Sequence, residues 1–468
     1  METLQRTANR GSVSTGYDID NSLKLESDNS ERLHKTPSGA GNRRTFTISF
    51  WTKRTKINGV KQYLFEAGNS DADHDRFTIR FGTGDTLDIQ TSATYLITNR
   101  VFRDTAAWYH IVVKVDTTDG TAANRIKLYV NGVEETSFAT DNRANINQNF
   151  DFSVNNTEIH NIGSSPIEGG LPYNGYIAEW VQIDGTASAP TAFGEVDEDS
   201  GIWKPINVSG LTFGTNGFYL DFEASGDLGN DANGGTDFTL VNIAAKDQAT
   251  DTPTNNFCTL NPLVNFKYTT NGIFEGGTQY GNSTGGGKGG AFGTMAVTSG
   301  KWYWEVKLIQ QVSHYIGVSA IDDGDDVKAT SDPEDVNSTF NFNISAARIE
   351  YHNNGSKVNG SLDAFTDFHT AGDIISIALN MDDNQISIYG NGTLQAGVAN
   401  TSLFDAANKM VVPFHATIND QVQYNFGGYS AYTESSPVSD ENGYGTFEYA
   451  PPTGYYALCT KNLALYGG

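Results

Sequence analysis

The chain has 468 residues, which corresponds to two to four domains at roughly 100–200 residues per domain. Its 55 acidic and 30 basic residues give a formal net charge of −25, so the chain lacks the cationic surface that nucleic acid or an anionic membrane surface requires. Hydrophobic residues make up 38% of the chain, yet no apolar run approaches the ~18 residues of a transmembrane helix, so we expect packed cores and no membrane insertion.

Alternation of polar and apolar residues predicts strands through the first half of the chain. A period of two places the apolar side chains on one face of a strand and the polar ones on the other. The clearest runs are 45–51, 76–81, 110–115 and 125–130. Asn131 and Gly132 follow the last run, and because both residues tolerate a positive φ, they predict a two-residue hairpin turn.

The second half repeats this pattern. Strand-like runs lie at 302–308, 374–379 and 385–389, and the last of them is followed by the turn sequence Gly390-Asn391-Gly392. Helical periodicity is scarce throughout. We therefore predict an all-β fold, with two antiparallel jelly-roll-type β-sandwiches in tandem and very little helix.

Composition and turn residues set the expected domain limits. The first sixteen residues are polar, and we expect them to form an extended arm that docks onto another chain. The predicted organisation is an N-terminal arm over 1–16, a first sandwich over 17–195, a connector over 196–262, and a second sandwich with a C-terminal closing strand over 263–468.

Longer motifs add a resemblance to known families. The segments 22–25, 41–51, 108–111, 128–132, 174–179 and 183–185 resemble the laminin-G-like, concanavalin A-like sandwich as phages carry it. The segments 300–306, 316–318, 372–374, 388–389 and 425–427 resemble a SPRY-type sandwich. The connecting segments 201–203, 213–222, 251–257 and 451–455 are similar to those of a group of largely marine phage proteins.

The resemblance implies a bacteriophage virion surface or tail-fibre protein that is made in the bacterial host cytoplasm. The implied partners are other virion proteins, reached through the N-terminal arm, further copies of the chain in a trimer, and a host-surface glycan held by the loop rims of the sandwiches. A purely structural virion module, such as a head decoration or a fibre connector, is the alternative. A glycan-cleaving tail enzyme is a third possibility.

Motifs for catalysis do not support the enzyme. A glycan hydrolase needs two carboxylates ~5–9 Å apart, and on one strand face the pattern Glu-x-Asp-x-x-Glu would supply them. No predicted strand carries this pattern, and Glu179 and Asp184 fall on opposite faces. The segment 281–285 matches a nucleophile elbow only in its letters, because it lies in a glycine-rich loop. We therefore predict a non-enzymatic protein without catalytic residues.

Acidic clusters are the candidates for metal binding. Calcium prefers hard oxygen ligands, and carboxylates gather at 227–237, at 322–326, and at Asp71, Asp73 and Asp75. None of the clusters has the EF-hand spacing, so solvated acidic loops remain the competing interpretation. Calcium is the one cofactor that the sequence suggests, with Asp71, Asp73 and Asp75 as its ligands.

Candidate glycan-binding residues are rings and polar groups beside turns. Sugar-binding rims use exposed aromatic rings, which stack on the pyranose face, with Asn and Asp nearby. Asp73, Tyr95, Tyr351 and Asn353 fit this description.

Two cysteines exclude a disulfide scaffold and a zinc cluster. Two buried free thiols are the favoured interpretation. A single bridge is the alternative, because Cys258 and Cys459 occupy the segments that open and close the second sandwich, which predicts that they lie near each other.

Overall fold

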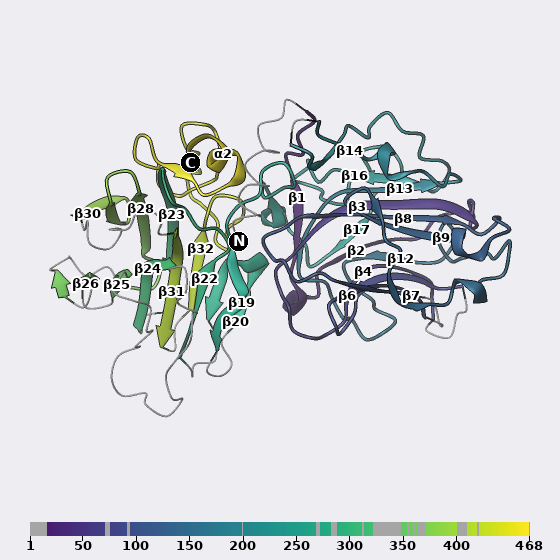
Figure 1. Cartoon of the computed structure of the whole chain (residues 1–468), viewed down its shortest axis with the longest axis horizontal. Helices are drawn as coiled ribbons and strands as arrows, with labels where there is room; N and C mark the ends of the chain where they lie inside the picture. The colour runs from purple at the N-terminus through teal and green to yellow at the C-terminus, as the bar shows by residue number, and fades with distance from the viewer. Residues whose placement is uncertain are drawn as a thin grey trace. The chain divides into compact units, whose positions relative to one another are not determined.

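The computed structural model describes residues 16–467 except 71–74, 91–93, 199, 268–271, 282–287, 311–312, 322–347, 353–354, 359–360, 364–369, 400–409 and 419–420. The chain forms two compact units, of which one ends at Asn255 and the other begins at Asn256 (Figure 1). Each unit contains two antiparallel sheets, and the predicted all-β fold of two tandem sandwiches is confirmed.

The first sandwich is built from two eight-stranded sheets. The first sheet has the order β10 (Val133–Glu134), β9 (Ile126–Val130), β8 (Tyr109–Asp116), β3 (Thr45–Arg54), β13 (Gly175–Asp184), β1 (Ser22–Leu25) and β18 (Gln248–Ala249), with β16 (Phe218–Leu220) also on β13. The second sheet has the order β11 (Phe138–Asp141), β7 (Thr94–Val101), β6 (Thr86–Gln90), β5 (Phe77–Phe81), β4 (Gln62–Ala67), β12 (His160–Ile162), β2 (Arg32–Lys35) and β17 (Thr239–Val241). A short ribbon of β14 (Gly194–Val196) and β15 (Trp203–Pro205) stands apart from both sheets.

The second sandwich follows the same plan. One sheet has the order β19 (Leu260–Lys267), β22 (Lys288–Gly293), β31 (Met410–Ile418), β24 (Ser313–Ile321), β25 (Arg348–His352), β26 (Gly355–Val358) and β27 (Ser361–Asp363). The other has the order β20 (Gly272–Phe274), β21 (Gln279–Gly281), β32 (Gln421–Asn425), β23 (Lys301–Leu308), β28 (Ile374–Asn380), β29 (Gln385–Gly390) and β30 (Thr393–Ala399), with β33 (Tyr456–Ala457) parallel to β23. One short α-helix, α2 (Thr460–Tyr466), lies near the end of the chain.

The alternation seen in the sequence places the cores. In β3, Phe46, Ile48 and Phe50 point into the core of the first sandwich. In β23, Trp302 and Trp304 point into the core of the second. Both predicted Asn-Gly turns are present: Asn131 and Gly132 have φ values of 49° and 77° and join β9 to β10, and the pair at 391–392 joins β29 to β30. Each hairpin therefore has the left-handed turn that matches strand twist.

The predicted connector 196–262 supplies strands to the first sandwich. β16 pairs with β13, β17 pairs with β2, and β18 pairs with β1. These strands complete both sheets, so the chain leaves the first sandwich only at Asn255.

Cys258 and Cys459 are buried free thiols on paired segments. Phe257 lies opposite Cys459, which makes Cys258 a neighbour of Leu458. Because side chains alternate along a strand, the two thiols point to opposite faces. Cys258 joins the main core of the second sandwich, whereas Cys459 packs with Phe257 and Phe447, so the pair is not arranged for a disulfide.

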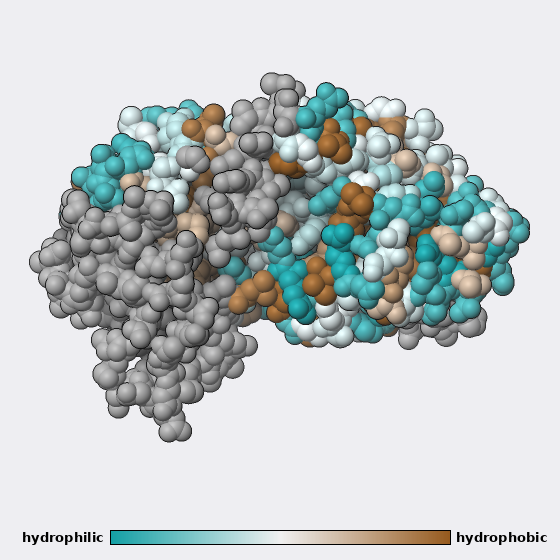
Figure 2. Space-filling view, in the orientation of Figure 1, coloured by the Kyte–Doolittle hydropathy of each residue, from teal (hydrophilic) through white to brown (hydrophobic). Residues whose placement is uncertain are grey.

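In the described part of the chain, no helix combines the length and hydropathy that a bilayer span requires. Figure 2 shows hydrophobic residues scattered among hydrophilic ones on the visible face of the first sandwich. The exposed large hydrophobic residues of the first sandwich include Val60, Val101 and Val133, which are far apart in sequence.

Candidate functional site

The outer face of the second sheet of the first sandwich is unusually polar. A register shift between Tyr63 and Phe65 turns both Leu64 and Phe65 into the core, so Tyr63 and Glu66 point outward. Arg80 of β5 lies opposite Tyr63, and Asp88 of β6 lies opposite Arg80. We call Tyr63, Glu66, Arg76, Arg80 and Asp88, together with Glu168, the charged face.

Ion pairs link the members of the charged face. Arg76 lies between two carboxylates, with Nη2 2.7 Å from Glu168 Oε1 and Nη1 3.7 Å from Glu66 Oε1. Arg80 donates to the Tyr63 hydroxyl and lies 3.5 Å from Asp88 Oδ2. Because Glu66, Arg76, Arg80 and Asp88 are almost entirely buried, each of their charges depends on a partner.

The loop over residues 163–173 crosses this face. Ser165 and Gly170 exchange backbone hydrogen bonds of 2.8 Å, and the Tyr63 amide donates to the Leu171 carbonyl at 3.1 Å. The Ser165 hydroxyl donates to Glu66 Oε1 at 2.8 Å. The loop thereby holds Glu168, whose side chain is 18% exposed, above the two arginines.

Burial and pairing shift the pKa values of Glu66 and Glu168 in opposite directions. Burial raises the pKa of Glu66 to about 7, although Ser165 and Arg76 stabilise its ionised form. Burial also favours the neutral form of Glu168, but hydrogen bonds from Tyr63 and Arg76 outweigh it and lower the pKa to about 2. Near neutral pH, Glu168 is therefore ionised while Glu66 is partly protonated.

Asn161 lies beside the charged face with unused hydrogen-bonding capacity. It lies opposite Glu66 in the β12–β4 pair and, like Glu66, points away from the core. Its side chain is 0% exposed, and neither Nδ2 nor Oδ1 has a partner among the described residues. Glu66 Oε2 is also buried without a hydrogen bond. Buried polar groups are nearly always paired, so the unpaired atoms of Asn161 and Glu66 are an exception in this sheet.

Two of the four sequence-predicted glycan-binding residues, Tyr95 and Tyr351, lie in the described part of the chain. Tyr95 is 5% exposed and packs edge-to-face on Phe152, so it offers no open ring face to a sugar. Tyr351 lies on β25 opposite Ile316. Asp73 and Asn353 lie outside the described residues.

The calcium prediction is only partly within the described residues. Asp75 accepts a hydrogen bond from Arg43 Nη2 at 2.6 Å, whereas Asp71 and Asp73 are outside the described part of the chain. Across the described residues, no three His, Cys, Asp or Glu side chains are grouped so that they could hold a metal ion. A calcium site at Asp71, Asp73 and Asp75 stays a prediction.

Sequence reasoning missed the charged face. The alternation in 76–81 does place Arg76, Thr78 and Arg80 on one face of a strand. It does not reveal that this face is covered, nor that Glu168 reaches it from a loop. The search for paired carboxylates on one strand therefore overlooked the pair of Glu66 and Glu168.

A serine–histidine contact lies in the other sheet. Trp203 Nε1 donates to His110 Nδ1 at 2.9 Å, and His110 Nε2 lies 2.9 Å from Ser49 Oγ. Because Nδ1 accepts, the neutral ring carries its proton on Nε2 and donates it to Ser49. Burial lowers the pKa of His110 to about 3, so this histidine does not act as a base toward the serine.

Two further buried glutamates share the raised pKa of Glu66. Glu179 accepts hydrogen bonds from Tyr219 at 2.7 Å and from Tyr17 at 3.1 Å, and burial raises its pKa to about 7. Burial likewise raises the pKa of Glu31 to about 7, although Lys24 lies 3.2 Å away.

These three carboxyl groups make the first sandwich more stable in mild acid. Their pKa rises from 4.5 to about 7 on folding, so the folded chain holds protons that the unfolded chain releases. The resulting stability is full below pH 4.5 and is lost as the pH rises through 7. We expect the free energy of unfolding, measured with urea, to fall between pH 6.5 and pH 8, by at most about 1.4 kcal/mol per pH unit for each group. Below pH 6.5 the fall is smaller, because burial lowers the pKa of His110 to about 3 and of His160 to about 4, and these histidines lose stability as the pH decreases.

The substitution Glu179→Gln removes one of the three titrating carboxyl groups. It should therefore weaken the dependence of the free energy of unfolding on pH. Glu195→Gln, at an exposed residue of β14, serves as the matched control and should leave this dependence unchanged. If the unaltered chain is as stable at pH 8 as at pH 6.5, or more stable, the raised pKa values of these carboxyl groups are contradicted.

Comparisons with known proteins agree with the two-domain organisation. Residues 28–191 match the concanavalin A-like lectin/glucanases superfamily, and residues 301–429 match the SPRY domain. No curated protein matches the chain. The chain therefore contains a laminin-G-like domain and a SPRY domain.

Solved structures resemble single parts of the chain. The SPRY domain of human HERC1 is 21% identical, with 35% of this chain and 96% of that chain covered and a TM-score of 0.26. A proposed carbohydrate-binding protein from Bacteroides ovatus is 14% identical, with 48% and 58% covered and a TM-score of 0.34. A heptameric SAP-like pentraxin from Limulus polyphemus is 17% identical, with 37% and 80% covered and a TM-score of 0.28.

Proposed function

We propose that the chain is a non-enzymatic binding protein whose first sandwich binds a glycan at Asn161 and the adjoining charged face, after a local opening that exposes the Asn161 amide. The observation that carries this proposal is the Asn161 amide, which is fully buried with both polar atoms unpaired beside the unpaired Oε2 of Glu66. Planar amides and carboxylates suit the paired hydroxyls of a sugar. The match to the concanavalin A-like lectin superfamily supports the same class of ligand.

The biological setting is proposed from the sequence. Similarity of the connecting segments to phage proteins supports a virion surface or tail-fibre protein that attaches to host-surface glycan. A trimer would raise the avidity of weak single sites, because later binding events become intramolecular. A purely structural virion module remains the alternative, and it predicts that the isolated chain binds no glycan.

Replacing Asn161 with leucine should separate binding from stability. Leucine has a similar shape and no polar atoms, so we expect stability to stay the same or to rise by up to about 3 kcal/mol. We measure binding to a panel of neutral and acidic oligosaccharides and to bacterial surface polysaccharide. The affinity for the glycan that binds should fall at least about tenfold, because one or two hydrogen bonds are lost. Asn147→Leu, at an exposed position of the same sandwich, is the matched control and should bind normally.

The same samples test a second candidate function, glycan cleavage. The opposite pKa values of Glu66 and Glu168 favour it, since one carboxyl is kept protonated and the other ionised. For a binding protein, the chain length of the polysaccharide stays constant during incubation. Shortening that Glu168→Gln abolishes would establish the enzyme instead. Normal binding by the Asn161→Leu variant would refute the proposed site.

A further inference from the structure

The carboxylate of Glu168 occupies a site built for an anion. Arg76 Nη2, Lys61 Nζ and Arg80 Nη1 lie 2.7, 3.4 and 3.6 Å from its oxygens, and Tyr63 adds a hydrogen bond. Arg76 is 2% exposed, and the Arg80 side chain is 6% exposed. Guanidinium groups in such a buried position bind carboxylates strongly and in a defined orientation.

The cations and the anion belong to different parts of the fold. Arg80 lies in β5, where its pairing with β4 and β6 fixes it, and Arg76 directly precedes that strand. Glu168 lies on the loop over residues 163–173, next to Gly169 and Gly170. An added Cβ at either glycine would meet no atom within 4 Å, so the loop beside Glu168 is open to solvent. A change in the position of the Glu168 side chain, which is 18% exposed, would need no movement of the strand that carries Arg80.

The charge balance requires an anion at this position. Asp88 pairs with Arg80, and Glu66 lies 3.7 Å from Arg76. Because Glu66 is partly protonated near neutral pH, it does not fully neutralise Arg76. Removal of Glu168 would take the nearest carboxylate from Arg76 and leave the buried arginines with more positive charge than Glu66 and Asp88 neutralise, which is costly. A neutral sugar does not replace that charge, whereas a sugar carboxylate does.

We propose that the seat formed by Arg76, Arg80, Lys61 and Tyr63 is a receptor for the carboxylate of an acidic, uronic-acid-type sugar, and that Glu168 fills it when the sugar is absent. This inference rests on the proposed glycan binding and names its ligand class. Binding then exchanges one carboxylate for another, with no covalent step. The apparent affinity of the unaltered chain is lowered by the fraction of molecules in which Glu168 occupies the seat.

The experiment uses the full chain with Glu168→Ala and sodium glucuronate as the probe. The variant should melt at a lower temperature than the unaltered chain, and glucuronate should restore most of the loss by binding the folded state. Glucose, and sodium chloride at the same ionic strength, should not restore it. By calorimetry, the variant should bind glucuronate about tenfold more tightly than the unaltered chain does, because the competing carboxylate is gone.

Matched variants make the result specific. Glu195→Ala removes an exposed glutamate that pairs with Lys204, and it should show neither the loss nor the rescue. Adding Arg80→Gln to Glu168→Ala should abolish the rescue. If Glu168→Ala does not fold, Glu168→Gln keeps the side-chain volume and serves for the binding measurement.

The outcomes separate this inference from the proposed function. Rescue by glucose as well as by glucuronate, or no rescue in a folded variant, overturns the carboxylate receptor. If the carboxylate receptor is overturned but neutral glycans still bind in a way that depends on Asn161, the proposed function stands without the receptor. Glucuronate rescue together with normal glycan binding by Asn161→Leu would instead confirm the receptor and refute the Asn161 site.

Discussion

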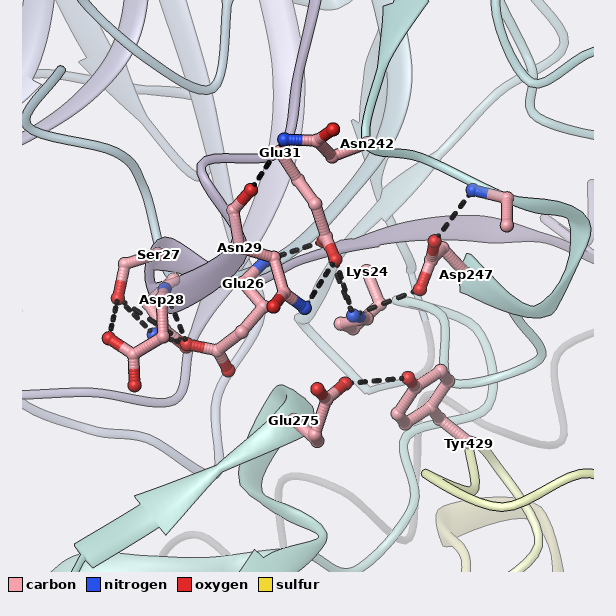
Figure 3. Close-up of polar contacts among 12 residues, drawn as sticks. Lys24, Glu26, Ser27, Asp28, Asn29, Glu31, Asn242, Asp247, Glu275 and Tyr429 are labelled. Carbon is pink, nitrogen blue, oxygen red and sulfur yellow. Dashed lines mark hydrogen bonds and ion pairs between the residues drawn. The ribbon is translucent and has the colours of Figure 1, made fainter. Parts of the chain in front are cut away.

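Replacement of Lys24 by methionine is expected to destabilise the first sandwich by about 3–5 kcal/mol at neutral pH. The Lys24 ammonium is fully buried, 3.2 Å from Glu31 and 2.9 Å from Asp247 (Figure 3). Asp247 ends the short 3₁₀ helix η5 (Ala245–Asp247), and its Oδ2 also accepts from the Ala244 amide at 2.8 Å. Methionine retains most of the volume but leaves two buried carboxylates without a cation.

Urea unfolding of the full chain, followed by tryptophan fluorescence with the transitions of the two sandwiches fitted separately, measures this loss. The loss should be smaller at pH 5, because the pKa of Glu31 is about 7 and its protonated form needs no cation. Lys204→Met is the matched control: this lysine pairs with Glu195 and Asp197 at the surface, and its removal should cost at most about 1 kcal/mol. A loss of under 1 kcal/mol for Lys24→Met would show that water or rearrangement neutralises the cluster.

The substitution Glu305→Leu should destabilise the second sandwich by at least about 4 kcal/mol. The Glu305 carboxylate is fully buried and accepts four hydrogen bonds, each 2.8 or 2.9 Å long, from the hydroxyls of Tyr303 and Tyr432 and from the amides of Glu448 and Tyr449. Leucine leaves all four donors unpaired in the interior, and each such group costs roughly 1–3 kcal/mol.

The effect should be located in the C-terminal segment. Hydrogen exchange of the Glu448 and Tyr449 amides should accelerate first, since those amides lose their acceptor. Glu305→Gln keeps an acceptor oxygen and should lie between the leucine variant and the unaltered chain. Glu441→Leu, at an exposed position, controls for the added apolar surface. Unchanged exchange at residues 448–449 would mean that Glu305 does not anchor the segment.

Local pattern was sufficient for the fold class. The alternation at 45–51 and 302–308 determines which side chains face a core, because neighbouring residues of a strand always point to opposite sides. The Asn-Gly pairs at 131–132 and 391–392 determine two hairpins, because few other residues adopt a positive φ at low cost. Both features depend on a few adjacent residues, so the sequence alone specifies them.

The site depended on contacts between distant residues. The bulge at Leu64 decides that Glu66 points outward, and the loop over residues 163–173 decides that Glu168 meets Arg76. The residues around Tyr95 in the sequence are typical of a sugar-binding rim. In the structure Tyr95 packs against Phe152 and is part of the core. Lys24 is on β1 and Asp247 comes from the segment predicted as a connector. Alternation reports the side to which a residue points, but burial depends on what the rest of the chain places over that side, and only the tertiary structure decides that.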